Sequence, residues 1–448
     1  MHAGFSSCSI SSKTVWKRAK NVTFDVYYHV NNGWDFLIPG GLNMRILVTG
    51  ARMWYALNSI RLLARDGHEV FAADSGKISG GLYSRYLKGK FIYPPVSEKS
   101  DEFIDCLLAK IEELKIDILY PTFEEGFVIS RYIDRFRGHV KVILPNHKNI
   151  EMLHDKWTMT KYAESLEIPV PGTVLLKDFE AEKYSFPLIL KPRDQRSAQG
   201  IVKIDSLGEL KKLSGTLDGS RFMIQEFKRP YQICTTGLAY EGKLLGNIIY
   251  YNIREYPESG GVGTCRLSIR NDRIDSYVEK IVADLGYSGF ISMDFLYDDV
   301  EDRYYLVDVN PRMSPGLLVA YRSGLDFAKA YVELNERPET VSLPSPEAGN
   351  GTFTTALEIG WYTSTLFKGK FMKLKGFLRS RKHLKDDTWD IKDPMPFMVV
   401  LFAMAYSAIF GPFMGGQAKG FSLGATYDSE KFASKKAEEA HEEKKEVI

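Results

Sequence analysis

The segment Tyr304-Tyr305-Leu306-Val307-Asp308-Val309-Asn310-Pro311-Arg312 predicts a β-strand that ends at a proline. Asp308 and Asn310 are two residues apart, so their side chains share one face of that strand. An earlier apolar run, Ile291–Tyr297, predicts a second strand, and the acidic stretch Asp298–Asp302 between the two predicts a hairpin loop. The segment therefore places polar side chains in the middle of apolar β-structure.

This hairpin brings a third polar side chain to the same place. If Tyr297 pairs with Arg303, Asp294 lies on the face of Asp308, one diagonal step away. Two carboxylates and an amide between apolar strands repel one another and are poorly solvated. A hard divalent cation removes that conflict, and Mg²⁺ prefers a few oxygen ligands together with nucleotide phosphates. The alternative is a solvent-facing hairpin with its acids on the wet side.

Three weaker signals accompany the hairpin. Lys191 ends the apolar strand Pro187–Lys191, where its ammonium group can reach a phosphate or simply face solvent. Lys156, at a predicted helix start, is equally ambiguous. The strand Phe222–Phe227 ends in polar residues, so its backbone can meet an adenine edge, or it can be an ordinary edge strand.

Periodicity divides the chain into two kinds of structure. Residues 44–148 alternate short apolar strands with amphipathic helices, which predicts βαβ units and a parallel sheet. The predicted elements there are strands at 45–49, 69–73, 116–120 and 140–144 and helices at 54–65, 103–114 and 127–136. Residues 149–338 instead show paired strands with Gly/Pro turns, which predicts an α+β domain. Its predicted strands are 187–191, 222–227, 233–240, 243–251, 291–297 and 304–310, and its predicted helices are 157–166, 207–213, 273–284 and 325–334.

Composition excludes several classes of protein. The chain has 448 residues, of which 44% are hydrophobic and 26% charged, which is typical of folded domains and not of disordered or fibrous proteins. Its net charge of +2 is too small to drive nucleic-acid binding. The four cysteines form no CxxC motif or Cys/His cluster, so we expect neither a disulfide framework nor structural zinc, and a reducing, cytoplasmic environment. The strand-to-helix turn after Gly50 lacks GxGxxG, which argues against a dinucleotide.

The two ends of the chain differ from the middle. Residues 1–43 are rich in serine and basic residues before the first acid, Asp25, so they are either an extension ahead of Met44 or an organellar targeting segment. Residues 339–448 predict a linker, an apolar helix and a charged tail. The uncharged stretch 394–416 has a proline-free part, 397–411, that is short for a membrane span, which favours a buried or membrane-surface helix through 397–410.

In this order and spacing, these residues resemble the ATP-grasp superfamily, and most of all its carbamoyl-phosphate-synthetase-like group. The resemblance extends from Met44 to about Leu334. It implies a pre-ATP-grasp α/β domain at 44–148 and an ATP-grasp domain at 149–338, with a lid subdomain at about 149–228 and a metal-binding subdomain at about 229–338.

The resemblance also implies roles for individual residues. Lys156 and Lys191 would hold ATP phosphates, helped by Arg193, Arg196 or Ser197. Asp294, Asp308 and Asn310 would bind Mg²⁺, with Mn²⁺ as an alternative metal, and Arg312 would stabilise the transferred phosphoryl group. The adenine and ribose would be bound by the hinge, which consists of Gln225, Glu226, the Phe227 backbone and Gln232.

Three positions depart from the family's pattern. The ribose-binding acid is Gln232, which still hydrogen-bonds but less strongly than a carboxylate. The phosphate-covering loop 193–200 has one glycine, and the metal position Asp308 is glutamate in many members. The stretch Gly260–Gly263 with Arg266 predicts a mobile loop near the acyl site, or an ordinary glycine turn.

The activity that the resemblance implies is an ATP- and Mg²⁺-dependent ligase. It would join a small-molecule carboxylate to an amine, or a thiol, through an acyl phosphate. Glu124 and Glu125 would either contact the amine or cap the next helix. Two alternatives remain: phosphorylation of bicarbonate, and a nucleotide-binding regulator with little turnover. Neither the substrates nor the oligomeric state can be derived from the sequence.

Overall fold

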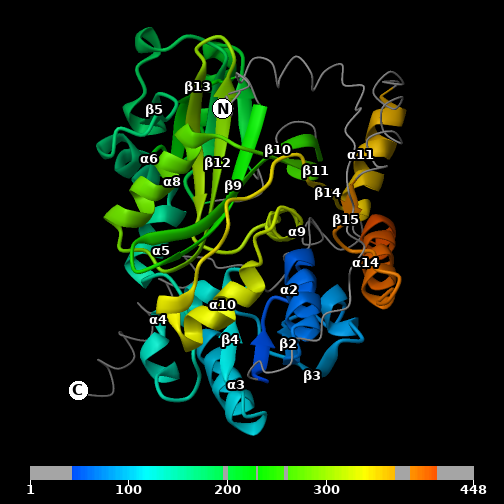
Figure 1. Ribbon diagram of the computed structural model, residues 1–448. Coiled ribbons are helices and arrows are strands. Elements are labelled where there is room, and N and C mark those ends of the chain that lie inside the picture. The colour runs from blue at the N-terminus through cyan, green and yellow to red at the C-terminus, as the bar shows by residue number, and fades with distance from the viewer. Residues whose placement is uncertain (1–42, 195–199, 229–230, 257–260, 369–383, 411–448) are drawn as a thin grey trace, which may run out of the picture. The chain divides into compact units, whose positions relative to one another are not determined.

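Three β-sheets organise the described residues, which are 43–194, 200–228, 231–256, 261–368 and 384–410, with side chains described up to residue 406. All of them belong to one compact unit, residues 41–448. A computed structural model provides the coordinates (Figure 1). The expected fold class, an N-terminal α/β part followed by an α+β part, is confirmed.

The first sheet is parallel, with strand order β3-β2-β1-β4. In β1 (Arg45–Val48), Ile46 and Val48 belong to one hydrophobic cluster and Leu47 to another, because helices cover both faces of the sheet. The elements that accompany β1 are α2 (Trp54–Arg65), β2 (Glu69–Asp74), the 3₁₀ helix η1 (Gly80–Tyr83), β3 (Leu87–Ile92), α3 (Ser100–Glu113), β4 (Ile118–Tyr120), α4 (Glu125–Arg131) and the 3₁₀ helix η2 (Ile133–Phe136).

Several elements of this region differ from the sequence predictions. The helix predicted at 127–136 is divided into α4 and the 3₁₀ helix η2. The strand predicted at 140–144 is wrong: Lys141 makes one isolated bridge to Ile118, while the side chains of Val140, Val142 and Leu144 pack on the core and produce the apolar pattern. Strand β3 was not among the predicted elements, although its lysines alternate with less exposed residues as in a half-exposed strand. Helix α2, in contrast, has the predicted bounds.

The second sheet is small and antiparallel, with strand order β5-β8-β6-β7. Its core consists of Leu188, Leu190, Ile204, Leu210 and Ile224. The elements of this region are α5 (His147–His154), α6 (Lys156–Ser165), β5 (Thr173–Leu175), η3 (Leu176–Asp178), η4 (Ala181–Lys183), β6 (Leu188–Pro192), β7 (Val202–Ile204), α7 (Leu207–Ser214) and β8 (Phe222–Glu226).

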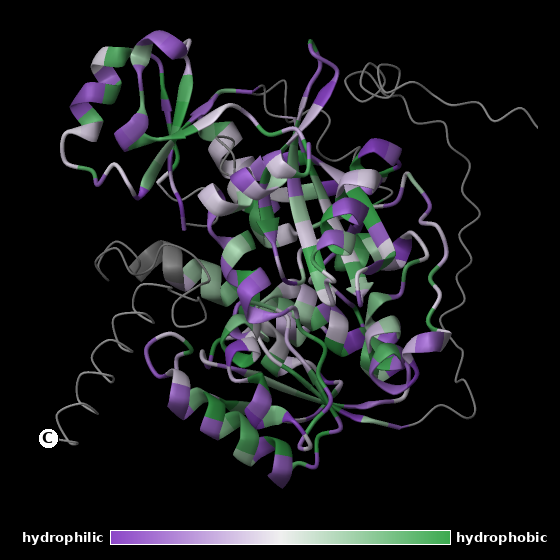
Figure 2. Ribbon diagram, turned by 90° about the vertical axis from the view of Figure 1, so that its left-hand side faces the viewer, coloured by the Kyte–Doolittle hydropathy of each residue, from purple (hydrophilic) through white to green (hydrophobic). Residues whose placement is uncertain are grey.

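The third sheet has seven strands in the order β13-β12-β9-β10-β11-β14-β15. Its strands are mostly apolar, whereas the outer helices carry hydrophilic residues (Figure 2). Its strands are β9 (Tyr231–Tyr240), β10 (Lys243–Tyr256), β11 (Val262–Ile269), β12 (Gly289–Asp298), β13 (Arg303–Asn310), β14 (Gly351–Phe353) and β15 (Lys385–Asp386). The helices of this part are α8 (Asp272–Asp284), α9 (Leu317–Arg322), α10 (Phe327–Glu336), the 3₁₀ helix η5 (Pro338–Thr340), α11 (Thr355–Phe367) and α14 (Met395–Phe410).

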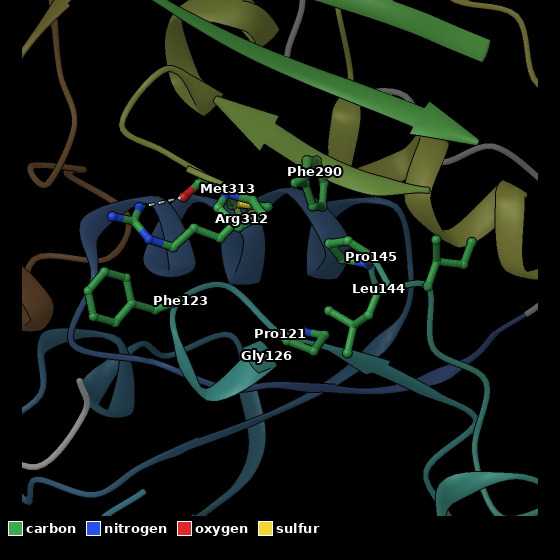
Figure 3. Close-up of a pocket in the computed structure, with 10 residues that line it drawn as sticks. Pro121, Phe123, Gly126, Leu144, Pro145, Phe290, Arg312 and Met313 are labelled. Carbon is green, nitrogen blue, oxygen red and sulfur yellow. Dashed lines mark hydrogen bonds between the residues drawn. The ribbon is translucent and has the colours of Figure 1, made fainter. Parts of the chain in front are cut away.

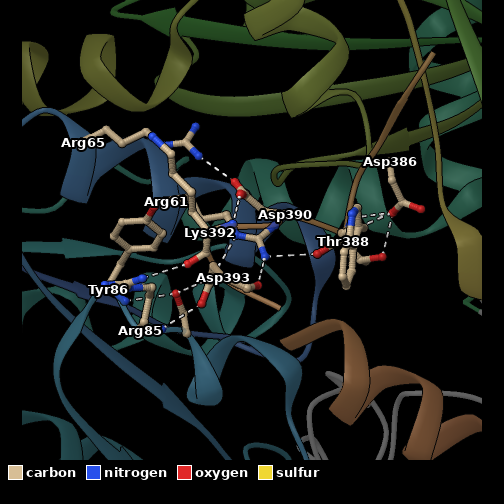
Figure 4. A network of polar contacts seen from close by, with 11 residues as sticks. Arg61, Arg65, Arg85, Tyr86, Asp386, Thr388, Asp390, Lys392 and Asp393 are labelled. Carbon is tan, nitrogen blue, oxygen red and sulfur yellow. Dashed lines mark hydrogen bonds and ion pairs between the residues drawn. The ribbon is translucent and has the colours of Figure 1, made fainter. Parts of the chain in front are cut away.

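The segment after residue 339 does more than the predicted linker, helix and tail. Strand β14 pairs with β11, and β15 pairs with β14, so this segment extends the third sheet. The residues after β15 bind α2: Arg61 donates to Asp393 at 3.0 Å, and Arg65 donates to Asp390 at 2.7 Å (Figure 4). Among the described helices, none combines the length and apolarity needed to cross a bilayer.

Candidate functional site

The two predicted metal-binding carboxylates face each other across the pair β12–β13. Asp294 lies directly opposite Asp308, and not one diagonal step away as the predicted loop required. The hairpin pairs Tyr297 with Tyr304, a register that by itself would place Asp308 on the opposite face. A β-bulge at Val307 adds one residue to β13 and returns Asp308 to the face of Asp294.

The proximity of these carboxylates affects their ionisation. Burial, and then the neighbouring Asp308, raise the pKa of Asp294 to about 6. Asn310 places its amide Nδ2 3.4 Å from Asp308 Oδ2. Among the described residues, no group of three or more His, Cys, Asp or Glu side chains could bind a metal ion by itself. Two carboxylates and an amide match the oxygen donors of an ion that also binds phosphate oxygens and water.

Two lysines approach these carboxylates from the second sheet and its helix. Lys156 is the first residue of α6, and its Nζ lies 3.5 Å from Asp308 Oδ1. Lys191, in β6, is only 4% exposed. Burial, and then the positive charge of Lys156, lower the pKa of Lys191 to about 8. The sequence predictions therefore named two cations that the fold brings to one place.

Short contacts fix the start of α6, which carries Lys156, to the end of β6, which carries Lys191. Asp155 caps α6 by accepting a hydrogen bond from the Thr158 backbone N–H at 2.8 Å. Its carboxylate also pairs with Arg193 at 2.8 Å, and the Lys156 backbone N–H donates to the Arg193 carbonyl at 2.9 Å. The start of α6 is thereby fixed to the end of β6, which carries Lys191.

Arg312 connects this group of residues to the N-terminal sheet. Its guanidinium donates to Asn310 Oδ1 at 3.0 Å and to the Met313 carbonyl at 3.1 Å. The same guanidinium lies 4.7 Å from the centre of the Phe123 ring (Figure 3). Its Nε lies 3.9 Å from Glu124 Oε1. The aliphatic part of Arg312 lines a pocket together with residues of the 121–126 loop and Phe290.

The two neighbouring glutamates, Glu124 and Glu125, make different contacts. Glu125 is fully buried and accepts hydrogen bonds from the Thr49 hydroxyl at 2.8 Å and from the backbone N–H groups of Thr122 and Phe123 at 3.0 Å. Burial raises its pKa. Glu125 thus holds the loop before α4, which is the capping alternative, whereas Glu124 faces Arg312.

The predicted hinge residues use their side chains in different ways. Gln225 is buried, and its amide donates to the Thr173 hydroxyl at 2.8 Å. Glu226 is exposed, and its backbone N–H donates to the Gly172 carbonyl at 2.9 Å. The Phe227 ring lies 5.4 Å from Lys203 Nζ.

Two further residues, Gln232 and Ser197, were predicted to bind the nucleotide. Gln232 Oε1 accepts a hydrogen bond from Asn252 Nδ2 at 2.9 Å. Ser197 and most of its loop lie outside the described residues.

The prediction for Arg266 is wrong. It lies in strand β11 and not in a mobile loop, and only 1% of its side chain is exposed. Its guanidinium pairs with Asp387 at 2.5 Å and stands 5.8 Å from the centre of the Trp54 ring. The glycines misled the prediction, since Gly263 allows close packing: a Cβ there would lie 2.0 Å from Asn252 Oδ1.

Sequence reasoning missed three titratable groups near the paired carboxylates Asp294 and Asp308. Burial and then Lys156 lower the pKa of His154, at the end of α5, to about 4. Burial and then Asp294 raise the pKa of Glu255 to about 7, and burial raises that of Cys234 well above its usual value. Glu255 lay beyond the end of the predicted strand 243–251, so no periodicity pointed to it. The Cys234 side chain stands opposite Asp294 in the pair β9–β12.

Residues 153–316 match the family model of the ATP-grasp domain, which spans the two lysines, the paired carboxylates and Arg312. This chain contains an ATP-grasp domain. It is 22% identical over 183 residues to the carbamoyl-phosphate synthase of Methanobrevibacter smithii, a match that covers 39% of this chain and 49% of that one. It is 26% identical over 202 residues to the D-alanine–D-alanine ligase of Neisseria meningitidis, covering 40% and 66% respectively.

A solved structure agrees in fold. The biotin carboxylase of Campylobacter jejuni, in a β,γ-ATP complex, superposes with a TM-score of 0.56 at 17% identity, covering 69% of this chain and 74% of that one. This likeness concerns the fold alone. The chain spans about half the length of the first of its curated relatives.

Proposed function

We propose that this protein is an ATP- and Mg²⁺-dependent ligase that joins a carboxylate to an amine, or a thiol, through an acyl phosphate. One observation carries the proposal: Asp294 and Asp308 face each other at the point where Lys156 and Arg312 converge. Opposed carboxylates flanked by cations suit a metal-bound triphosphate, because the metal screens the acids and the cations bind the phosphates.

Asp294, Asp308 and Asn310 would hold the Mg²⁺ ion. Their donors are oxygens, the ligands that Mg²⁺ prefers, and few enough to leave positions for phosphate and water. Burial, and then the charge of Asp308, raise the pKa of Asp294 to about 6, and a bound cation would favour its ionised form. The bound ion would neutralise charge that develops on the phosphate oxygens during transfer.

Lys156 and Lys191 would bind the phosphates. Lys156 pairs with Asp308 at 3.5 Å, so ATP binding would exchange this contact for one with a phosphate, while Asp308 would turn to the metal. The adenine edge would be read by the Glu226 carbonyl and the Phe227 backbone, because the Glu226 N–H is already donated to Gly172. Gln232, oriented by Asn252, would contact the ribose.

The reaction would proceed in two displacements. A carboxylate oxygen of the substrate attacks the γ-phosphorus, the bond to the β-phosphate oxygen breaks, and ADP leaves. The amine nitrogen then attacks the acyl carbon, inorganic phosphate departs, and the nitrogen loses its proton to solvent or phosphate. Positioning and charge neutralisation supply the catalysis, so the proposal requires no side-chain nucleophile.

Arg312 and Glu124 would bound the acyl end of this site. The Arg312 guanidinium is already oriented by Asn310 and by the Phe123 ring, so little conformational entropy is lost when it binds an anion. Glu124, 3.9 Å from Arg312, would face the positively charged end of an amino-acid substrate. The D-alanine–D-alanine ligase, by its name a ligase of amino acids, supports this class of substrate.

Bicarbonate phosphorylation is the second candidate. The similarity to a carbamoyl-phosphate synthase favours it. A nucleotide-binding regulator with little turnover is the third.

The experiment that tests the proposal is an ADP-release screen of the full chain with Mg²⁺ and pools of amino acids, peptides and small carboxylates. Release that requires both a carboxylate and an amine supports the ligase. Release with bicarbonate alone favours the second candidate, and tight ATP binding without release in any pool favours the regulator.

A further inference from the structure

The chain enters the second sheet just before β5 and leaves it just after β8, and both connections contact the β12–β13 hairpin. Before β5, the Pro169 carbonyl accepts a hydrogen bond from the Leu306 backbone N–H of β13 at 2.8 Å. After β8, Lys228 Nζ donates to Glu301 Oε1 at 2.9 Å, in the turn between β12 and β13. The hairpin that carries the paired carboxylates therefore also holds the two connections of the second sheet.

Lys228 lies at the centre of a partly buried ionic network. Its side chain is 12% exposed, and its ammonium group lies 4.5 Å from the centre of the Tyr305 ring of β13. The Tyr305 hydroxyl donates to Glu301, and Glu226 Oε2 lies 3.6 Å from Lys228 Nζ. Because two carboxylates and an aromatic ring hold this cation, its position is better fixed than that of an exposed ion pair.

Glu226, the last residue of β8, links the two connections to each other. Its backbone N–H donates to the Gly172 carbonyl at 2.9 Å, and its Oε2 accepts from the Gly172 backbone N–H at 3.3 Å. A Cβ on Gly172 would lie 2.8 Å from Glu226 Cδ, so a side chain there would displace the carboxylate. Through Glu226, Lys228 is thus linked to the entering connection as well as to the leaving one.

The same network is close to the proposed ATP site at both of its ends. Glu226 and Phe227, whose backbone is proposed to bind adenine, directly precede Lys228 in the sequence. Tyr305 lies three residues before Asp308 on β13. A rotation of the second sheet about its two connections would change the distance between the adenine-binding backbone and the metal-binding carboxylates.

We infer that Lys228 is a positioning residue for ATP. By joining the residues after β8 to Glu301 and Tyr305, it holds the adenine-binding backbone at a fixed distance from Asp294 and Asp308. Its ammonium group is already engaged by this network, so the inference assigns it neither to a phosphate nor to the metal. The loss of Lys228 should therefore weaken binding of the base and leave binding of the triphosphate chain intact. The inference rests on the proposed ATP site.

Calorimetric titration of the full chain with Mg²⁺ and either ATP or inorganic tripolyphosphate tests the inference. In Lys228→Met, which keeps an unbranched side chain but removes its charge, affinity for ATP should fall roughly tenfold, as for one lost charged contact. Affinity for tripolyphosphate should not change. Lys228→Arg, which keeps the charge, should restore most of the ATP affinity. Adding Glu301→Gln to Lys228→Met should cause little further loss, because both substitutions break the same contact.

Hydrogen exchange of the nucleotide-free protein tests the same contact without ATP. The Glu226 backbone N–H, which is donated to the Gly172 carbonyl, should exchange faster in Lys228→Met than in the unaltered protein. The matched control is Lys183→Met, which removes a 65% exposed lysine from its pair with Glu180. It should change neither the exchange at Glu226 nor the affinity for ATP.

Unchanged ATP affinity in Lys228→Met, or an equal loss of affinity for tripolyphosphate, would overturn the inference. So would unchanged hydrogen exchange at Glu226. If the unaltered protein bound no ATP, the proposed function would be wrong, and the role of Lys228 in ATP binding with it. Faster exchange at Glu226 in Lys228→Met would then show that the contact is structural only.

Discussion

Asp308 lies directly opposite Asp294 because one extra residue, Val307, bulges out of β13. Without the bulge the hairpin register would turn Asp308 to the other face, and the two carboxylates could not share a metal ion. Bulges are common beside functional sites, where they re-aim a side chain. The position of the bulge at Val307 is the strongest indication that the pairing of Asp294 with Asp308 is functional.

Replacing Asp308 with alanine should abolish metal-dependent ADP formation. The site would lose one of its two carboxylates, and Lys156 would lose its ion pair with Asp308. The melting temperature should change little, because the lost ion pair with Lys156 is offset by relief of the repulsion between Asp308 and Asp294. Asp308→Glu, which keeps the carboxylate, should keep activity. ADP release at saturating ATP measures both, and full turnover in Asp308→Ala would remove the site assignment.

Replacing Asp294 with asparagine should make the protein more stable while it weakens Mg²⁺ binding. The folded-state pKa, about 6, is above the unfolded value of 3.8, so the folded protein holds the proton more tightly and loses stability as pH rises between these values. Above pH 6 the ionised carboxylate destabilises the fold, and asparagine removes that cost. We expect a melting temperature at pH 7 higher by about 2–4 °C.

The pH dependence of the melting temperature shows whether the stabilisation by Asp294→Asn comes from removal of the ionised carboxylate. The difference between Asp294→Asn and the unaltered protein should be largest above pH 6 and should vanish near pH 4. Asp308→Asn is the matched control: it loses the ion pair with Lys156 and should not stabilise. A stabilisation that is independent of pH would contradict the assignment of the effect to this carboxyl group.

ATP affinity should decrease as pH rises through about 8, the lowered pKa of Lys191. Phosphate binds the charged ammonium group. When Lys191 is neutral, ATP binding therefore requires that Lys191 first take up a proton. Affinity at pH 9 should be about tenfold weaker than at pH 7, as expected for one required proton. Lys191→Met should bind ATP weakly at both pH values. Equal affinity of the unaltered protein at pH 7 and 9, measured by calorimetry, would show that Lys191 does not bind phosphate.

The buried pair of Arg266 and Asp387 should be essential for stability. Both side chains are at most 1% exposed, so Asp387→Ala leaves a guanidinium buried without its counter-charge, at a cost of about 3–5 kcal/mol. Glu164→Ala, which breaks a surface pair with Lys161, is the control and should cost less than about 1 kcal/mol. Urea denaturation compares the two. Similar costs would mean that the segment after residue 339 is not an integral part of the fold.

Local patterns in the sequence predicted much of the fold. Helix α2 and the strands that carry Lys191, Asp294 and Asp308 come from periodicity and turn residues, and they lie close to where they were predicted. The register of β12–β13 could not be predicted, because a bulge depends on packing between strands and not on composition. Arg266 was misassigned because its partner, Asp387, lies 121 residues further along the chain.

The same limit applies to the environment of the site. The pKa values of Asp294, Glu255 and Lys191 depend on burial and on charges from other strands, which no local pattern encodes. The ion pairs that Asp387, Asp390 and Asp393 make with arginines of β11 and α2 likewise join segments far apart in the sequence, so no local pattern predicts them.

Calorimetric titration of the full chain with ATP, in the presence and absence of Mg²⁺, tests the central claim most directly. If Asp294, Asp308 and Asn310 hold the metal under a triphosphate bound by Lys156 and Lys191, ATP will bind tightly only with Mg²⁺. Asp308→Ala will then lose that metal dependence. Equal affinity with and without Mg²⁺, or no binding of ATP at all, would contradict the account.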